Sequence, residues 1–327
     1  MGEFRQDRTT GAWTIVAPER NQRPHANLAG DGPAAPAAAY DPDCPFCPGN
    51  EAMLPRIIEE KAADAPSGWQ TRVVPNKFPI LATNAAEAGE DGALHEVIIE
   101  TPRHDADLPD LTLAEMQTVV ETWHRRFGAA LAKRSTATAL LFRNHGSAAG
   151  ASLRHAHSQL VALQDVPSKQ AAALSWARRH HERIGECVTC KELSLELEAD
   201  RRVVELAEHF AVLVPFAAGD PLEQWIVPRR HTASFLGASG EERAALAAAI
   251  QRAFRRLEAV AGHAACNLVI EPGSNQPADE PYAHWAVRIV PNTTTPGGFE
   301  MLSGIRVNPS VPEHDADQLR DGRNVQV

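Results

Sequence analysis

The stretch His155-Ala156-His157-Ser158-Gln159 places two imidazoles and an amide at every second position of the chain. In an extended segment, side chains two residues apart point to the same face, so both rings are expected on one face of a strand. One imidazole can hold a metal ion, while the other, neutral near its ordinary pKa of ~6.5, can attack an electrophile. The stretch therefore indicates a metal ligand beside a nucleophile.

A Gly- and Ser-rich turn, residues 144–152, leads directly into this stretch. The backbone N–H groups of such a turn can bind a phosphate. Gln159 and Ser152 can donate hydrogen bonds to the non-bridging oxygens of a phosphoryl group and so stabilise charge in the transition state. Attack by His157 on an α-phosphorus would form a covalent nucleotidyl-histidine. We therefore expect His157, Gln159 and Ser152 to be the catalytic residues.

The two halves of the chain carry the same order of features. Each has a CxxC pair, a β-rich segment that ends in a histidine, a long amphipathic helix, a buried strand, a polar loop and a second histidine. The two histidines are 51 residues apart in the first half (104 to 155) and 53 in the second (231 to 284). The duplication predicts two repeats, residues 1–167 and 168–327. The shared residues are Cys44, Cys47, His104 and His155 in the first repeat and Cys187, Cys190, His231 and His284 in the second.

Each repeat has one long helix among its strands, a pattern typical of an α+β fold with antiparallel sheets. Both helices begin with a capping box, in which a Ser or Thr precedes a Glu by three residues. The expected spans are 113–134, with Thr112 and Glu115 as the box, and 240–260, with Ser239 and Glu242.

Three further segments are assigned from composition. Residues 168–186, rich in Ala and Arg, are expected to form the helix that joins the repeats. Residues 26–43, rich in Ala, Pro and Gly, are typical of a mobile loop. The polar tail from about Pro312 is expected to be loosely held.

Two Cys and two His in each repeat form a tetrahedral S₂N₂ donor set, which suits Zn²⁺. Such closed sites have a structural role, so we expect two structural zinc ions per chain. The alternative for Cys44-Pro45-Phe46-Cys47 is a redox dithiol, which needs its first Cys at a helix N-terminus. Pro48-Gly49-Asn50 comes next and disfavours a helix there, which favours the zinc interpretation.

Composition narrows the class of protein. The 327 residues carry a formal net charge of −10, with 43% hydrophobic and 23% charged residues. The net negative charge argues against general binding to nucleic acid or to an anionic membrane. The start, Met1-Gly2-Glu3-Phe4-Arg5, has no apolar signal-peptide core, and no run approaches the ~20 apolar residues of a membrane span. We expect a cytoplasmic protein.

His155-Ala156-His157-Ser158-Gln159 resembles the HxHxQ signature of the histidine-triad superfamily. The duplicated layout resembles the galactose-1-phosphate uridylyltransferase family within it, so a duplicated histidine-triad-like fold is implied. The resemblance covers nearly the whole chain. It rests on Phe4 to Asp7, Gly11 to Arg20, Cys44 to Asn50, Asn76 to Phe78, Asn144 to Gln159, His284-Trp285 and Gly298 to Glu300.

The resemblance implies a ping-pong exchange in which a histidine takes UMP from UDP-glucose and passes it to galactose 1-phosphate. His157 would be the nucleophile, and Gln159 and Ser152 would contact the transferred phosphoryl group. It also implies a homodimer, with an Arg pair reaching phosphates across the interface. The implied substrate-binding residues are Arg20, Arg23, Asn76, Phe78, Asn144, Gly146, Gly150 and Glu300.

Alternatives to this exchange remain open. ADP-glucose phosphorylase, a close relative with the same two zinc sites, uses adenine as base and phosphate as acceptor, and a related hydrolase would use water. A zinc scaffold without activity would need only the CxxC pairs, whereas this chain also has His157, Gln159 and the glycine turn. The second repeat has Ala286 where the first has His157, so one active centre per chain is expected.

Overall fold

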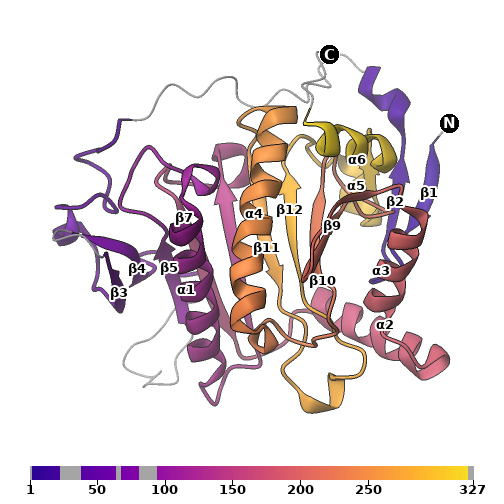
Figure 1. Ribbon diagram of the computed structural model, residues 1–327, viewed down its shortest axis with the longest axis horizontal. Coiled ribbons are helices and arrows are strands. Elements are labelled where there is room, and N and C mark those ends of the chain that lie inside the picture. The colour runs from indigo at the N-terminus through magenta and orange to yellow at the C-terminus, as the bar shows by residue number, and fades with distance from the viewer. Residues whose placement is uncertain (1, 23–37, 64–67, 81–93, 323–327) are drawn as a thin grey trace.

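The computed structural model describes residues 2–22, 38–63, 68–80 and 94–322, and within them ten strands form one antiparallel sheet (Figure 1). Figure 1 shows this sheet running across the whole molecule. From one edge to the other, its strands are β3 (Glu59–Ala62), β4 (Trp69–Pro75), β5 (Leu94–Ile99), β7 (His157–Leu163), β6 (Thr138–His145), β11 (Cys266–Glu271), β12 (Ala286–Pro291), β10 (Gln224–Pro228), β9 (Phe210–Leu213) and β8 (Val203–Leu206).

The strand order confirms the duplication. The first repeat contributes β3-β4-β5-β7-β6, and the second, read from the opposite edge, contributes β8-β9-β10-β12-β11. Strands β6 and β11 pair at the centre, with Asn144 opposite Asn267 and Phe142 opposite Val269. The expected α+β fold with two antiparallel repeats is therefore present, and the repeats are joined edge to edge into one sheet.

Two long helices, α1 (Leu113–Leu131) and α4 (Gly240–Ala261), lie side by side on one face of the sheet (Figure 1). Both begin with the expected capping box, in which the side chains at N-cap and N3 bond reciprocally to each other's backbone. Their apolar sides bury Trp123 and Phe127 of α1 and Ile250 of α4. Fully burying one such side chain contributes ~1.5–3 kcal/mol, so these two helices and the covered face form the core.

The strand alternation divides β7 between the two faces of the sheet. Ser158 points to the helices, where its hydroxyl accepts a hydrogen bond from Trp123 Nε1 at 2.7 Å. His157 and Gln159 therefore point to the face opposite α1 and α4. In register with them are Ile99 and Val97 of β5.

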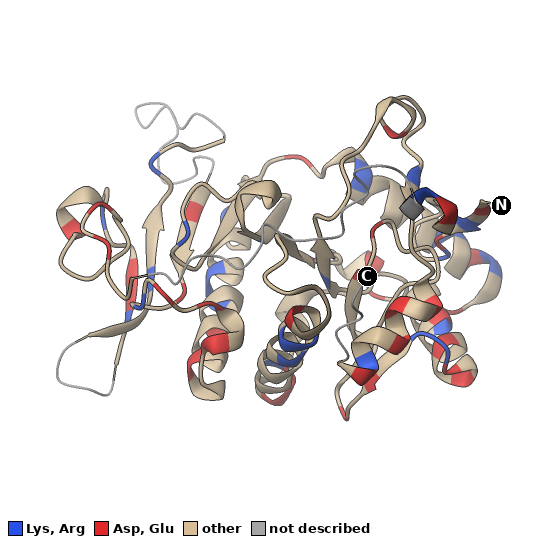
Figure 2. Cartoon of the chain, turned by 90° about the horizontal axis from the view of Figure 1, so that it is seen from above, with Lys and Arg blue, Asp and Glu red and all other residues tan. Residues whose placement is uncertain are grey.

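A smaller sheet lies at the second-repeat end of the molecule (Figure 1). It consists of β1 (Glu3–Gln6), β2 (Trp13–Val16) and β13 (Arg306–Asn308). Figure 2 shows basic and acidic residues side by side at this end, and there Arg5 pairs with Glu313 at 3.0 Å. The remaining α-helices are α2 (Ser168–Ile184), α3 (Val188–Ala199), α5 (Gly298–Ser303) and α6 (Pro312–Asp321).

Helix α2 confirms the helix expected between the repeats. The expectation of a loosely held tail was wrong, because α6 packs against β8 and α4. Pro312 occupies the first turn, where its fixed φ favours a helix, and Ala316 and Leu319 are fully buried. Polar residues on the exposed side of this short helix concealed its apolar side. Most of the segment 26–43, interpreted as a loop, lies outside the described residues.

Among the described residues, no helix is both long and apolar enough to cross a bilayer.

Short 3₁₀-helices connect several of these elements. The 3₁₀-helices include η1 (Pro18–Gln22), η2 (Glu51–Met53), η4 (Leu108–Asp110), η5 (Ser147–Ala149), η6 (Phe235–Gly237) and η7 (Pro277–Asp279).

Candidate active site and metal centres

The first repeat brings four buried donor atoms to within 4.8 Å of one another, from Cys44, Cys47, His104 and His155. Cys47 Sγ lies 3.4 Å from His104 Nδ1 and 3.8 Å from His155 Nδ1. A tetrahedral Zn²⁺ with bonds of ~2.3 Å to sulfur and ~2.0 Å to nitrogen separates such atoms by about 3.5 Å. The donor set and its spacing therefore fit zinc.

The surroundings of this group also fit a closed metal centre. The Nε2–H of His155 donates to the backbone oxygen of Thr101 at 2.7 Å, which leaves Nδ1 facing the two sulfurs. Residues 44–50 form turns, in which the Asn50 side chain donates to the Cys44 oxygen at 2.8 Å. No helix begins at Cys44, and burial raises its pKa to about 11, which disfavours the redox dithiol.

The second repeat has the same arrangement in Cys187, Cys190, His231 and His284. Cys190 Sγ lies 3.3 Å from His231 Nδ1 and 3.5 Å from His284 Nδ1. The two histidine rings are 5.4 Å apart and nearly perpendicular, compared with 5.3 Å in the first repeat. Cys187 differs from its counterpart because it occupies the N-cap position of α3. Both groups expected from the sequence are thus assembled with a zinc-compatible geometry.

His157 is the first residue of β7, and His155 lies just before the strand. The Nδ1–H of His157 donates to the backbone oxygen of His155 at 2.8 Å, which leaves the Nε2 lone pair free. His157 is 7% exposed, and its ring packs edge-on against Phe46, with centroids 5.3 Å apart. Burial lowers the pKa of His157, so its imidazole is neutral at pH 7. A neutral ring with a free Nε2 can act as a nucleophile.

Gln159 belongs to a polar cluster on the same face. Its Oε1 lies 2.8 Å from His95 Nε2 and 3.3 Å from Asn76 Nδ2. Phe78, two residues after Asn76, is 81% exposed. Sequence reasoning identified Gln159, Asn76 and Phe78 but missed His95, since a lone histidine at the start of a strand matches no motif.

The glycine turn between β6 and β7 has the backbone geometry that its composition predicts. Gly146 and Gly150 have φ values of 80° and 87°, which side chains disfavour. A Cβ at Gly146 would lie 2.8 Å from the Cβ of Ala265 in the second repeat. Ser152 is exposed at the end of this turn, between Gly150 and His155 of the first Cys₂His₂ group.

The second repeat also holds the glycine turn through a series of hydrogen bonds between asparagine side chains. Asn267 Nδ2 donates to Asn144 Oδ1 and to the Ala149 oxygen, each at 2.9 Å. Asn292 Nδ2 in turn donates to Asn267 Oδ1 at 2.5 Å. Asn144 therefore supports the turn through Asn267, a residue that sequence reasoning did not single out.

Two of the expected substrate-binding residues lie far from His157 within one chain. Arg20 is in η1, just after β2, and Glu300 is in α5, where its carboxylate accepts the Gly297 N–H at 2.9 Å. Figure 1 shows α5 and β2 at the end of the molecule opposite β7. Arg23 lies outside the described residues.

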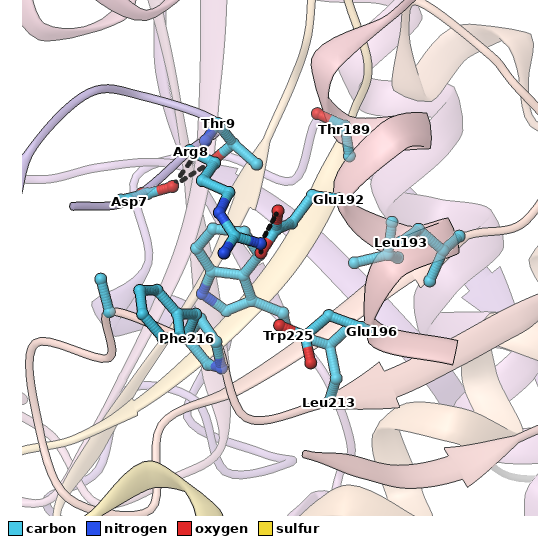
Figure 3. A pocket seen from close by; sticks show the side chains of 13 residues that line it. Asp7, Arg8, Thr9, Thr189, Glu192, Leu193, Glu196, Leu213, Phe216 and Trp225 are labelled. Carbon is cyan, nitrogen blue, oxygen red and sulfur yellow. Dashed lines mark hydrogen bonds and ion pairs between the residues drawn. The ribbon is translucent and has the colours of Figure 1, made fainter. Parts of the chain in front are cut away.

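In the second repeat, side chains and the N-terminal segment cover the corresponding face of the sheet. Counting from His284, Ala286 and Arg288 occupy the positions that His157 and Gln159 have after His155. The Arg288 guanidinium lies 3.9 Å from the centre of the Trp225 ring and pairs with Glu271 at 2.8 Å. Figure 3 shows the pocket beside Trp225, where Arg8 of the N-terminal segment reaches Glu192 of α3 at 3.0 Å.

Comparisons with known proteins agree with this geometry. The family model for the N-terminal domain of galactose-1-phosphate uridyl transferase matches residues 2–167, half of the chain. ADP-glucose phosphorylase from Arabidopsis thaliana is 28% identical over 333 residues, covering 98% of this chain and 92% of that protein. Galactose-1-phosphate uridylyltransferase from Thermotoga maritima is 25% identical over 339 residues, covering 98% of each.

Solved structures give the same result. The crystal structure of an ADP-glucose phosphorylase from Arabidopsis thaliana with bound ADP-glucose is 27% identical, with a TM-score of 0.85 and coverage of 100% of this chain and 99% of that one. A uridylyltransferase structure is 25% identical, with a TM-score of 0.74 and coverage of 98% of each chain. With its duplicated sheet and its family-model match, the chain belongs to the galactose-1-phosphate uridylyltransferase family.

Proposed function

We propose that this enzyme transfers a nucleoside monophosphate from a nucleotide sugar to an acceptor phosphate through a covalent intermediate at His157. The observation that carries the proposal is the hydrogen bond from His157 Nδ1 to the His155 oxygen at 2.8 Å, which leaves Nε2 free. Nε2 attacks the α-phosphorus, the new P–N bond forms, and the bond to the bridging oxygen breaks. The sugar 1-phosphate leaves, and an acceptor phosphate oxygen then displaces Nε2 from the phosphorus.

The neighbouring residues have roles suited to this chemistry. Gln159 and Ser152 donate to the non-bridging oxygens as charge develops on them. The turn with Gly146 and Gly150 presents backbone N–H groups to the phosphates. The side chains of Asn76 and Phe78 border the nucleotide, and the large exposed area of Phe78 suits stacking on a base.

The finer proposal is UMP exchange between UDP-glucose and galactose 1-phosphate. The family model and the full-length similarity to the Thermotoga maritima uridylyltransferase support it. A second candidate is phosphorolysis of ADP-glucose, in which inorganic phosphate collects AMP. Supporting it are the 28% identity to the plant phosphorylase and the TM-score of 0.85 to its ADP-glucose complex.

The enzyme is further proposed to act as a homodimer. Arg20 and Glu300 lie at the end of the folded molecule opposite His157 (Figure 1). A second copy is therefore needed to bring these two residues to a substrate bound at His157. Guanidinium groups suit phosphate oxygens, which supports Arg20 and Arg23 of one copy facing the other copy's substrate. Glu300 of one copy would likewise contact the sugar bound to the other copy.

Zinc is the proposed occupant of both Cys₂His₂ groups, where it would crosslink the chain and leave His157 unligated. The cytoplasm, where thiols stay reduced, is the proposed location because four cysteines must remain available as ligands. The two repeats are proposed to divide at residues 167 and 168, between β7 and α2.

The deciding experiment is intact mass spectrometry of the protein after incubation with UDP-glucose or ADP-glucose, without an acceptor. A UMP or AMP adduct that is missing from the His157→Ala variant would identify both the base and the nucleophile. Adding galactose 1-phosphate or inorganic phosphate to the isolated adduct then identifies the acceptor by loss of the added mass. Folded, zinc-loaded protein that forms no adduct with either donor would refute covalent transfer from these sugars.

A further inference from the structure

His95 occupies a buried position beside the proposed active site that none of the roles above uses. It lies on β5 in register with Val161 of β7, and is 7% exposed. Both nitrogens of its ring have polar neighbours. Ile80 N is 3.1 Å from Nδ1, whereas Nε2 has Gln159 Oε1 at 2.8 Å and Asn76 Nδ2 at 3.0 Å. Such a fully partnered ring between two active-site amides indicates a specific role.

The partners of His95 determine its tautomer. The backbone N–H of Ile80 can only donate, so Nδ1 must be the accepting nitrogen. The proton of the neutral ring is then on Nε2, which donates to Gln159 Oε1. Burial lowers the pKa of His95, and this keeps the ring in that neutral form at pH 7.

The same contacts determine which way the Gln159 amide points. Asn76 Oδ1 accepts the Phe78 N–H at 2.8 Å, so the Asn76 group facing Gln159 is its NH₂. Gln159 Oε1 therefore accepts from both His95 Nε2 and Asn76 Nδ2. A flipped Gln159 would place its own NH₂ against two donors and lose both hydrogen bonds. In the favoured orientation its NH₂ is left for an acceptor outside the cluster.

We propose that His95 is a positioning residue, which holds Gln159 so that its NH₂ donates to a non-bridging oxygen of the transferred phosphoryl group. This inference rests on the proposed function, because it assumes that Gln159 serves a phosphoryl group attacked by His157. A donor that is oriented before the reaction needs no reorganisation as charge develops, and that is the source of its catalytic value. Asn76 supports the same orientation through a longer contact.

The test measures the rate of adduct formation at saturating nucleotide sugar, with whichever of UDP-glucose and ADP-glucose labels the wild-type protein. We expect His95→Ala to slow this step about tenfold while the half-saturating donor concentration stays within about threefold, since the lost contact acts in the transition state. His95→Gln keeps an N–H donor near the Nε2 position, so its rate should stay within about threefold of wild type.

A double-mutant cycle separates positioning from a general structural effect. In a Gln159→Ala background, itself about a hundredfold slower, His95→Ala should change the rate less than about twofold. The matched control is His124→Ala, which removes a half-buried histidine whose Nε2 faces the Leu236 oxygen on the helix-covered side. This control should leave the rate at saturation within about twofold of wild type.

The outcomes are distinguishable. A wild-type adduct with an unchanged His95→Ala rate would overturn the role of His95 and leave the proposed function standing. Equal slowing with and without Gln159, or equal slowing by His124→Ala, would likewise overturn positioning through Gln159. Absence of any wild-type adduct would overturn the proposed function and this inference with it.

Discussion

The two repeats use the same sheet face for opposite purposes. In the first repeat, β7 presents His157 and Gln159, with a free imidazole nitrogen and a free amide donor. In the second, β12 presents Ala286 and Arg288, and the face is closed by aromatic packing and by the N-terminal segment (Figure 3). Both repeats keep a Cys₂His₂ group. Under the proposed function, the two repeats therefore differ in reactivity because of the side chains that follow the last histidine of this group.

The largest expected effect comes from removing one metal ligand in each repeat. Cys47→Ser should lower zinc content by about one per chain and slow adduct formation by about two orders of magnitude, because His155 anchors the backbone that aims His157. Cys187→Ser should lower zinc content equally and leave the adduct rate within about threefold. Metal analysis and intact mass measure both quantities. Equal loss of adduct in both variants would contradict the division of roles.

Arg288 and Gln159 hold equivalent positions, and their removal should have opposite consequences. Arg288→Ala leaves the buried Glu223 without its nearest cation and should lower the free energy of unfolding by about 3 kcal/mol. Gln159→Ala should cost about 1 kcal/mol in stability while slowing adduct formation about a hundredfold. Urea unfolding followed by fluorescence measures the first effect. A larger loss of stability for Gln159→Ala than for Arg288→Ala would contradict this prediction.

Asn267 links the repeats because it bonds the turn at Asn144 and Ala149. Asn267→Ala should slow adduct formation about tenfold, since a loosened phosphate turn positions the donor less well. The matched control is Asn308→Ala, which removes a buried amide that bonds the Ala218 oxygen beside the small sheet. If the control slows the reaction as much, general loss of stability would explain the effect.

The smallest expected effects are equal in the two repeats. Thr112 and Ser239 cap α1 and α4 in the same way, so replacing either with Ala should cost about 1 kcal/mol in the free energy of unfolding. The double variant should lose about the sum, because the two caps share no partner. Thermal and urea unfolding measure the losses. A marked inequality would show that the repeats contribute unequally to the scaffold.

Local sequence patterns were sufficient to predict much of this structure. The capping boxes predicted where both long helices begin, because each pairs side chains three residues apart. The CxxC and histidine spacing predicted both donor groups, because two Cys followed by two His occur in the same order in each repeat. The alternation in His155 to Gln159 predicted which side chains of β7 share a face.

The features that the sequence left open depend on contacts between distant segments. The His95 ring is oriented by Ile80 and Gln159, and no motif records such a meeting of three segments. The pairing of β6 with β11 is between strands more than a hundred residues apart, so local periodicity has no information on it. Helix α6 was missed because Ala316 and Leu319, its two fully buried apolar side chains, are too few to produce a clear apolar period.

The pairing of β6 with β11 has a consequence for any attempt to separate the repeats. Within the described sheet, the outermost strands are β3 and β8, while the middle is a hydrogen-bonded ladder. A fragment ending near residue 167 would present β6 as a bare edge, with unpaired N–H and C=O groups and its neighbour removed. Bare edges are templates for pairing with other chains, so each half shields the other from aggregation. The second repeat thus covers the strand edge that the first repeat would otherwise expose.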